Sequence, residues 1–185
     1  MKIGIISDTH GSEARWSLAY DKYLKNADLI VHAGDILYHG PRNPMLEDYN
    51  PALLAEKLNA CPVPILAARG NCDSEVDAMV LNLPVQAPYG YAIVDGLRIV
   101  VTHGHLVPSE EEKDAMAAQL KADLFITGHI HVNVLEKRGR TIFLNPGSPS
   151  LSKREDGRST IAMLANGKIE IIDIDTDEIL LSLPV

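Results

Sequence analysis

The chain has 185 residues, with 17 lysines and arginines against 25 aspartates and glutamates, and its formal net charge at pH 7 is -8. A nucleic-acid groove needs clustered cationic side chains, so this balance disfavours a nucleic-acid polymer as the partner. Hydrophobic residues make up 46% of the chain, which is enough to bury one core. We therefore expect a single domain over residues 1–185.

The cysteine count and the lack of a long apolar run predict a protein of a reducing, aqueous compartment. Two cysteines, Cys61 and Cys72, are too few for a disulfide framework. No run approaches the roughly 18 apolar residues that cross a bilayer, and the first residues lack the long apolar stretch of a secretory signal. We expect a cytoplasmic protein with no membrane partner.

The first elements predict a βαβ unit. Residues 2–7 form a short β-branched run that ends in a polar turn, which is typical of a buried strand. Ser12 can cap the helix that follows, and residues 28–32 form a second buried strand. Two strands joined in this way pair in parallel, so the chain begins an α/β sheet.

A long irregular loop follows at residues 36–50. It carries two prolines and a compact polar group of His39, Arg42 and Asn43. Loops of this length inside a domain are usually functional or form a contact surface. The loop therefore leaves a homo-oligomer open as one interpretation.

The remaining elements shift from helices to hairpins. The strongest hairpin signal is Asp95-Gly96 between two alternating runs, and Ser109 opens a helix. In chain order we expect a helix at 52–60, a strand at 63–68, a helical turn at 75–81, strands at 91–94 and 97–102, a strand at 123–127, strands near 133–136 and 141–144, and a final antiparallel run at 160–164, 168–174 and 178–183.

Five buried strands end in the same way, with a tight turn that holds a metal-capable side chain. The carboxyl ends of strands form the ligand-binding edge of an α/β sheet, so these turns are expected to converge. Mixed imidazole and carboxylate ligation suits manganese, iron, zinc or nickel better than calcium. Seven ligands are too many for one tetrahedral ion and suit two ions. The candidate ligands are Asp8, His10, Asp35, Asn71, His103, His129 and His131.

Each of these residues also has a simpler interpretation. Asp8 alone is a plausible helix cap, and Asn71 beside glycine is an ordinary turn residue. His129 and His131 point to the same side if the chain stays extended there. His32, inside an apolar strand, is expected to be a core histidine and not a ligand.

The ordered turns resemble the motifs of calcineurin-like metallophosphoesterases, and residues 34–44 and 69–77 resemble the small bacterial YfcE-type phosphodiesterases of that superfamily. The resemblance implies a four-layer α/β/β/α sandwich of two mixed sheets, the metallo-dependent phosphatase fold, with the C-terminal hairpins in the second sheet. It also implies the division of the ligands: Asp8, His10 and His131 on the first metal, Asn71, His103 and His129 on the second, and Asp35 between them.

The implied activity is that of a metal-dependent phosphodiesterase acting on a small or activated diester. Two divalent ions, with manganese as the first choice, activate a bridging hydroxide that attacks phosphorus in line, and no protein nucleophile is required. Two alternatives stay open at this point. One is a phosphomonoesterase or nucleotidase, and the other is a non-catalytic metal-binding scaffold of the same fold.

The sequence departs from the family pattern at Cys72, where most members have a histidine after the Gly-Asn turn. A neutral thiol is a weak hydrogen-bond donor, so we expect a bias toward substrates with good leaving groups. An inert residue lining the pocket is an equally simple interpretation of Cys72. The candidate substrate contacts are Cys72, His105, His39 and Arg42.

Overall fold

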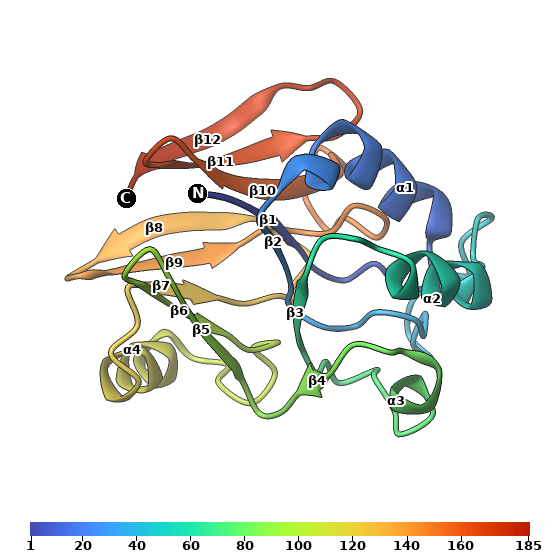
Figure 1. Cartoon of the computed structure of the whole chain (residues 1–185), viewed down its shortest axis with the longest axis horizontal. Helices are drawn as coiled ribbons and strands as arrows, with labels where there is room; N and C mark the ends of the chain where they lie inside the picture. The colour runs from blue at the N-terminus through green and yellow to red at the C-terminus, as the bar shows by residue number, and fades with distance from the viewer.

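Two mixed β-sheets form the centre of the molecule (Figure 1), and the computed structural model describes all of residues 1–185. The larger sheet contains β1 (Lys2–Ile6), β2 (Leu29–His32), β3 (Ile65–Ala68), β4 (Val85–Gln86), β10 (Thr160–Ala165), β11 (Lys168–Asp173) and β12 (Ile179–Pro184). The smaller sheet contains β5 (Gly90–Val94), β6 (Leu97–Val101), β7 (Leu124–Ile126), β8 (Val134–Arg138) and β9 (Thr141–Asn145). Their spatial orders are β12-β11-β10-β1-β2-β3-β4 and β5-β6-β7-β9-β8.

Helices cover the outer faces of both sheets, which confirms the four-layer arrangement. The helical elements are α1 (Glu13–Lys22), the 3-10 helix η1 (Leu24–Asn26), α2 (Pro51–Asn59), α3 (Asp77–Val80) and α4 (Glu110–Gln119). In Figure 1, α1 and α2 lie beside the larger sheet and α4 lies beyond the smaller one. No helix is long and apolar enough to cross a bilayer.

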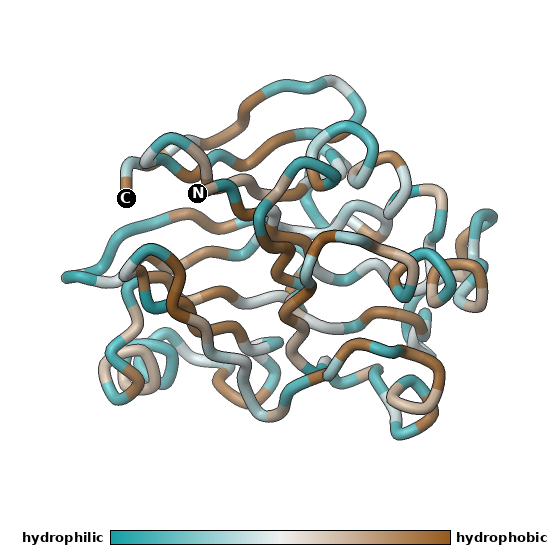
Figure 2. The backbone as a smooth tube through the Cα atoms, viewed as in Figure 1, coloured by the Kyte–Doolittle hydropathy of each residue, from teal (hydrophilic) through white to brown (hydrophobic).

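Because side chains alternate along the strands, the core has three parts: one between the two sheets, one between the larger sheet and α1 and α2, and one between the smaller sheet and α4. On β1, Ile3 and Ile5 face the space between the sheets, whereas Ile6 packs with Trp16 of α1. On β7, Leu124 and Ile126 face the same inter-sheet space, and the intervening phenylalanine packs toward α4. Figure 2 shows the resulting brown, apolar strands between more hydrophilic loops. A one-residue shift of register would turn every side chain of such a strand to the opposite face of the sheet. The register of these packed strands, and with it the position of each strand end, is therefore well defined.

The three C-terminal strands correct one expectation. They belong to the larger sheet and not to the second one. Because β2 and β3 extend the sheet on one side of β1, the other edge of β1 is open, and β10 pairs there in antiparallel fashion. On β10, Ile161 and Met163 face the helices while Ala162 and Leu164 face the inter-sheet core, which suits an interior strand.

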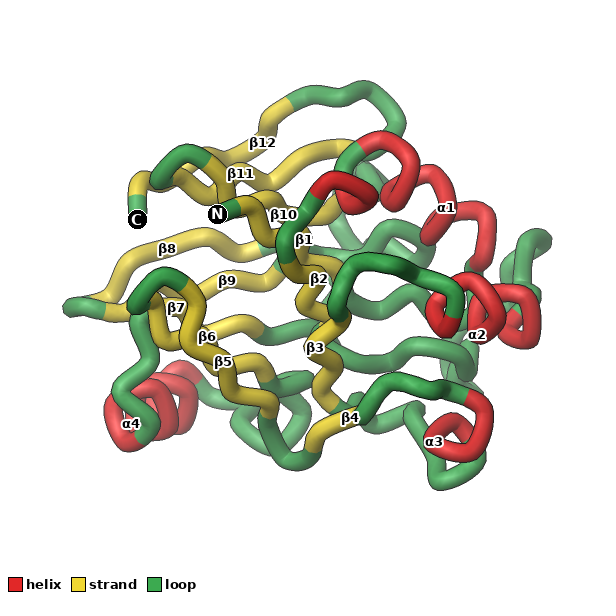
Figure 3. Tube along the Cα trace, viewed as in Figure 1, coloured by secondary structure: helices red, strands yellow, loops and turns green.

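The predicted loop at residues 36–50 is confirmed, and Figure 3 draws the segment between β2 and α2 in green. The adjoining strand β3 starts at Ile65, two residues later than expected, since Pro64 has no N–H for a ladder. Ser12, Asn50 and Ser109 cap α1, α2 and α4 through their side chains. These boundaries fix where each strand ends and where its functional turn begins.

Candidate metal centre

The turns after four strands bring carboxylates and imidazoles together in the interior. Asp8 and His10 follow β1, Asp35 follows β2, His103 follows β6 and His131 follows β7. All five are at most 2% exposed. The first two turns are joined by backbone bonds, from Asp8 N–H to the Gly34 carbonyl (3.0 Å) and from His10 N–H to the Asp35 carbonyl (3.1 Å). The centre therefore draws ligands from both sheets.

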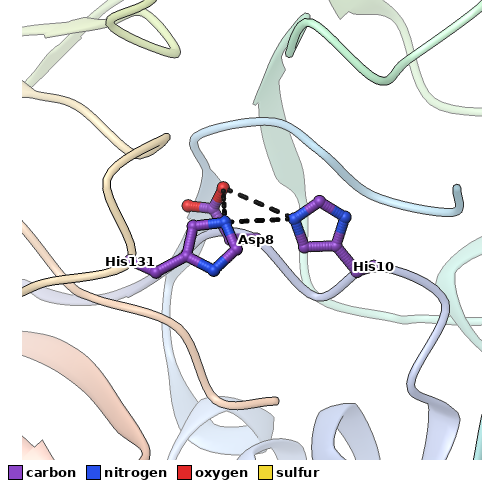
Figure 4. A group of neighbouring side chains, drawn as sticks. All are labelled: Asp8, His10 and His131. Carbon is purple, nitrogen blue, oxygen red and sulfur yellow. Dashed lines mark hydrogen bonds and ion pairs between the residues drawn. The ribbon is translucent and has the colours of Figure 1, made fainter. Parts of the chain in front are cut away.

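Asp8 lies at the middle of this cluster (Figure 4). Its Oδ1 is 3.2 Å from His131 Nε2 and 3.8 Å from both His10 Nε2 and His103 Nε2. Asp35 Oδ2 is 3.3 Å from His103 Nε2 and 3.6 Å from His10 Nε2. Both carboxylates thus face more than one imidazole, which is the arrangement that two neighbouring cations require.

The far ring nitrogens fix the orientation of the three histidines. Nδ1 of His10 bonds to the Tyr38 carbonyl (2.8 Å), Nδ1 of His103 to the Ala33 carbonyl (2.7 Å), and Nδ1 of His131 to the Leu151 carbonyl (2.5 Å). A carbonyl only accepts, so each Nδ1 carries the proton and each Nε2 presents a lone pair to the centre. Metal-binding histidines are held in this way.

No donor group of the protein bonds to these Nε2 lone pairs. His103 Nε2 is buried without a partner, and Nε2 of His10 and of His131 face each other at 3.2 Å. Two acceptors at that separation need a proton or a cation between them. The donor set of imidazole nitrogens and carboxylate oxygens fits Mn, Fe, Zn or Ni, so the residues present suit a divalent metal.

The chain at His129 and His131 is not extended, so the condition for the predicted same-side placement is not met. Their φ angles are 72° and 57°, in the left-handed region. His131 joins Asp8 and His10, whereas the His129 ring lies 5.1 Å from the His103 ring. The His129 N–H donates to Asp8 Oδ2 (3.0 Å), so its backbone supports the cluster as well.

Asn71 lies at the outer edge of the centre. It is exposed, and its Nδ2 donates to Cys72 Sγ at 3.3 Å. Cys72 N–H in turn donates to Asp35 Oδ1 at 2.8 Å. The structure therefore clusters the ligand atoms of five of the seven candidates, Asp8, His10, Asp35, His103 and His131. The His129 ring lies beside that of His103, and Asn71 lies next to Cys72 at the edge.

A protein-family model described as the calcineurin-like phosphoesterase superfamily domain matches residues 1–167. The chain belongs to this superfamily. It is accordingly a phosphoric ester hydrolase with a metal-binding site. The phosphodiesterase YfcE of Escherichia coli K12 is 38% identical over 181 residues, covering 97% of this chain and 96% of that protein.

Solved structures agree with the calcineurin-like fold. The structure of the E. coli phosphoesterase YfcE superposes with a TM-score of 0.87 at 34% identity, and each chain is covered completely. A zinc complex of Vps29 from Entamoeba histolytica superposes with a TM-score of 0.67 at 19% identity, covering 100% of this chain and 98% of that one. The second likeness concerns the fold alone.

Burial and charge set the protonation of this calcineurin-like centre. Burial lowers the pKa of His103, but Asp35 and Asp8 outweigh it and raise that pKa to about 9. Burial would raise the pKa of Asp35, and the His103 and His10 imidazoles hold it well below its usual range. The two carboxylates are therefore ionised at neutral pH, and the position between them favours positive charge. Without a metal that charge is a proton on His103 Nε2, and a bound cation would take the place of this proton and use the Nε2 lone pair.

Two polar residues outside the centre hold its loops. Asp73 accepts backbone N–H groups of Asp35 (2.9 Å), Ile36 (2.7 Å) and Gly70 (2.6 Å), and so ties the turn after β2 to the turn after β3. The sequence did not reveal this role, because an aspartate after a Gly-Asn turn is an ordinary turn residue.

His32 is a core histidine as expected. Its Nε2 bonds to the Thr9 hydroxyl, and burial lowers its pKa to about 4.

Four of the candidate ligands, Asp35, Asn71, His129 and His131, line a cavity of about 680 Å³. Of the predicted substrate contacts, Arg42 and Cys72 line this cavity. His105 lies beside the centre, with its ring 5.5 Å from that of His103. His39 lies elsewhere, because its ring packs edge-on against Tyr38 and Tyr49.

Lys153 also lines the cavity and was missed by sequence reasoning. No motif surrounds it, and it is more than 20 residues beyond the last predicted ligand. Only the folded chain brings Lys153 to the cavity, where its backbone N–H donates to the His131 carbonyl at 3.1 Å.

Proposed function

We propose that this chain is a phosphodiesterase that hydrolyses a small or activated phosphodiester at a dinuclear centre, by in-line attack of water on phosphorus. The observation that carries the proposal is the set of three buried Nε2 lone pairs directed at two ionised carboxylates. The likeness to E. coli phosphodiesterase YfcE supports the diester as the substrate class. A cytoplasmic location and a homo-oligomer remain predictions.

Asp8, His10 and His131 would hold one ion, and His103, His129 and Asn71 the other, with Asp35 shared between them. Two divalent cations lower the pKa of water and neutralise phosphoryl charge. The protein keeps the ligand imidazoles in one tautomer through three carbonyls and keeps the carboxylates ionised at neutral pH. Manganese is the proposed metal, since hard carboxylates and imidazoles together suit it.

No protein side chain is needed as a nucleophile. The cavity is lined by no serine or threonine and by one cysteine, Cys72, and burial raises the pKa of its thiol to about 12. A thiol with that pKa is neutral at pH 7 and a poor nucleophile. The attacking group is therefore proposed to be water, and the chain's own task is to position it and the phosphate.

The proposal is tested with Asp35→Asn, which keeps the shape of the side chain and removes its charge. The wild type is expected to bind two manganese ions, measured by elemental analysis, and to hydrolyse bis(p-nitrophenyl) phosphate. The variant is expected to lose at least about 100-fold in turnover, since residues that merely orient metal ligands already cost about 10–100-fold. Glu111→Gln, at an exposed position of α4, is the matched control.

Three results would contradict the proposal. Faster hydrolysis of phosphomonoesters than of diesters would make the chain a phosphomonoesterase or nucleotidase. Two bound ions without turnover of any ester would make it a scaffold. Equal activity of Asp35→Asn and Glu111→Gln would remove the shared carboxylate from the mechanism.

A further inference from the structure

Two cations at the mouth of the metal cavity have no partner within the protein. Seven of the eight arginines form an ion pair with a carboxylate, and Arg42 is the exception. Lys153 also forms no ion pair, and both side chains line the cavity. Both residues are exposed, whereas Asp35 and His131 below them are buried.

Hydrogen bonds hold the backbone that carries each cation. Arg42 lies in a turn in which Asn43 N–H donates to the Gly40 carbonyl (3.4 Å) and Asn43 Nδ2 donates to the His39 carbonyl (2.8 Å). Lys153 is held through His131, whose carbonyl accepts its N–H. The two cations thus start from defined positions on separate segments that face one cavity.

The charge at this mouth exceeds what the reacting phosphate needs. Asp35 is the only acidic residue that lines the cavity, and its carboxylate faces the ligand imidazoles. A phosphodiester carries a single negative charge, which a pair of divalent cations already meets. Two further unpaired cations in a chain of net charge -8 therefore call for a second anionic group.

We propose that Arg42 and Lys153 form an anion subsite that binds a further phosphate group on one ester arm of the substrate. Guanidinium binds phosphate through two parallel hydrogen bonds, and ammonium adds a point charge. Tyr38 and Ile130, which are 41% and 45% exposed, line the same cavity and offer apolar contact to the arm between the two phosphates. This assignment rests on the proposed diesterase function and narrows its substrate class.

The test uses two matched substrates, the p-nitrophenyl ester of thymidine 5′-phosphate and the same ester with a 3′-phosphate. The wild type is expected to prefer the 3′-phosphorylated ester in kcat/KM by about tenfold or more, as charge-assisted hydrogen bonds imply. Arg42→Met and Lys153→Met are each expected to lower this preference about tenfold. Lys137→Met, at an exposed and unpaired lysine of β8, is expected to keep it.

Binding of the products gives a readout that does not need turnover. By calorimetry, the wild type is expected to bind thymidine 3′,5′-bisphosphate more tightly than thymidine 5′-phosphate, and Arg42→Met and Lys153→Met are expected to lose that difference. Equal losses on both esters would overturn the subsite, because the cations would then act on the reacting phosphate. Hydrolysis of both esters by the wild type without preference would overturn the subsite alone. Absence of hydrolysis with an intact binding difference would overturn the diesterase and keep the subsite.

Discussion

Cys72 combines two roles at the edge of the metal centre. Its backbone N–H donates to Asp35 Oδ1 at 2.8 Å, so the residue orients the Asp35 carboxylate whatever its side chain is. Its thiol accepts from Asn71 and is neutral at pH 7, since burial and then Asp35 raise its pKa to about 12. A neutral thiol of such low acidity donates a proton poorly to a departing alkoxide.

Replacing Cys72 with histidine is therefore expected to help the slowest substrates most. For a diester with an alkyl leaving group, Cys72→His should raise kcat about 100-fold, at the lower end of the roughly 10²–10⁴-fold that general acid catalysis contributes. For bis(p-nitrophenyl) phosphate the gain should be small, since nitrophenolate departs without protonation. The ratio of the two rates is the measurement, and an equal effect on both esters would show that this position does not supply the acid.

The turns after β2 and β3 approach each other so closely that a side chain does not fit between them. A Cβ atom on Gly70 would lie 2.1 Å from Asp35 Oδ1 and 2.3 Å from Asp35 N. Asp73 holds the same two turns together from below through three backbone N–H groups. The position of Asp35 thus depends on the contact between two loops and not only on its own turn.

Gly70→Ala is expected to push Asp35 out of place and to weaken metal binding by about tenfold or more, as loss of ligand orientation does. Calorimetric titration with manganese measures this change. Gly139→Ala is the control: it has φ 58° and nothing within 4 Å, so it should cost about 1 kcal/mol of stability and leave metal affinity intact. Equal affinities in both variants would contradict the role given to this contact.

The sequence predicted most elements and the ligand turns because these are local signals. The runs before Asp8, Asp35 and His103 show strand character and end in recognisable turns. The membership of β10 to β12 in the larger sheet was not predictable, because strand pairing is decided by distant partners. Lys153 and Asp73 were missed for the same reason, since their roles come from contacts with His131 and with the turn after β2.

At the scale of the whole molecule, Asp123, just before β7, joins β6 to the turn between β8 and β9. It accepts hydrogen bonds from the Arg98 side chain at 2.8 and 3.0 Å and from Arg140 at 2.7 Å. Arg98, and then Arg140, hold the pKa of this carboxyl well below its usual range. A depressed carboxyl pKa gives stability that is present above the unfolded-state pKa of about 3.9 and lost as pH falls below it.

Asp123→Asn is therefore expected to lower the free energy of unfolding at pH 7 by about 1 kcal/mol, once solvent screening at this partly exposed group is allowed for. The difference from the wild type should shrink as pH falls below about 4, because the carboxyl of the unfolded wild-type chain then binds a proton while that of the folded chain stays ionised. Urea unfolding at pH 7 and pH 3 measures both values. Asp21→Asn, at an exposed aspartate without an ion pair, should show no such pH dependence, and a constant difference for Asp123→Asn would contradict the linkage.

Five of the seven candidate ligands have left-handed backbone, with φ of 55° at Asp8, 46° at His10, 55° at Asp35, 72° at His129 and 57° at His131. That conformation is unfavourable for residues other than glycine, and two of these five are also buried aspartates. The metal centre is thus a trade-off between stability and activity. Directed evolution for thermal stability without metal or substrate would replace these ligands first, so stabilised variants of this enzyme must be selected with its activity as a second criterion.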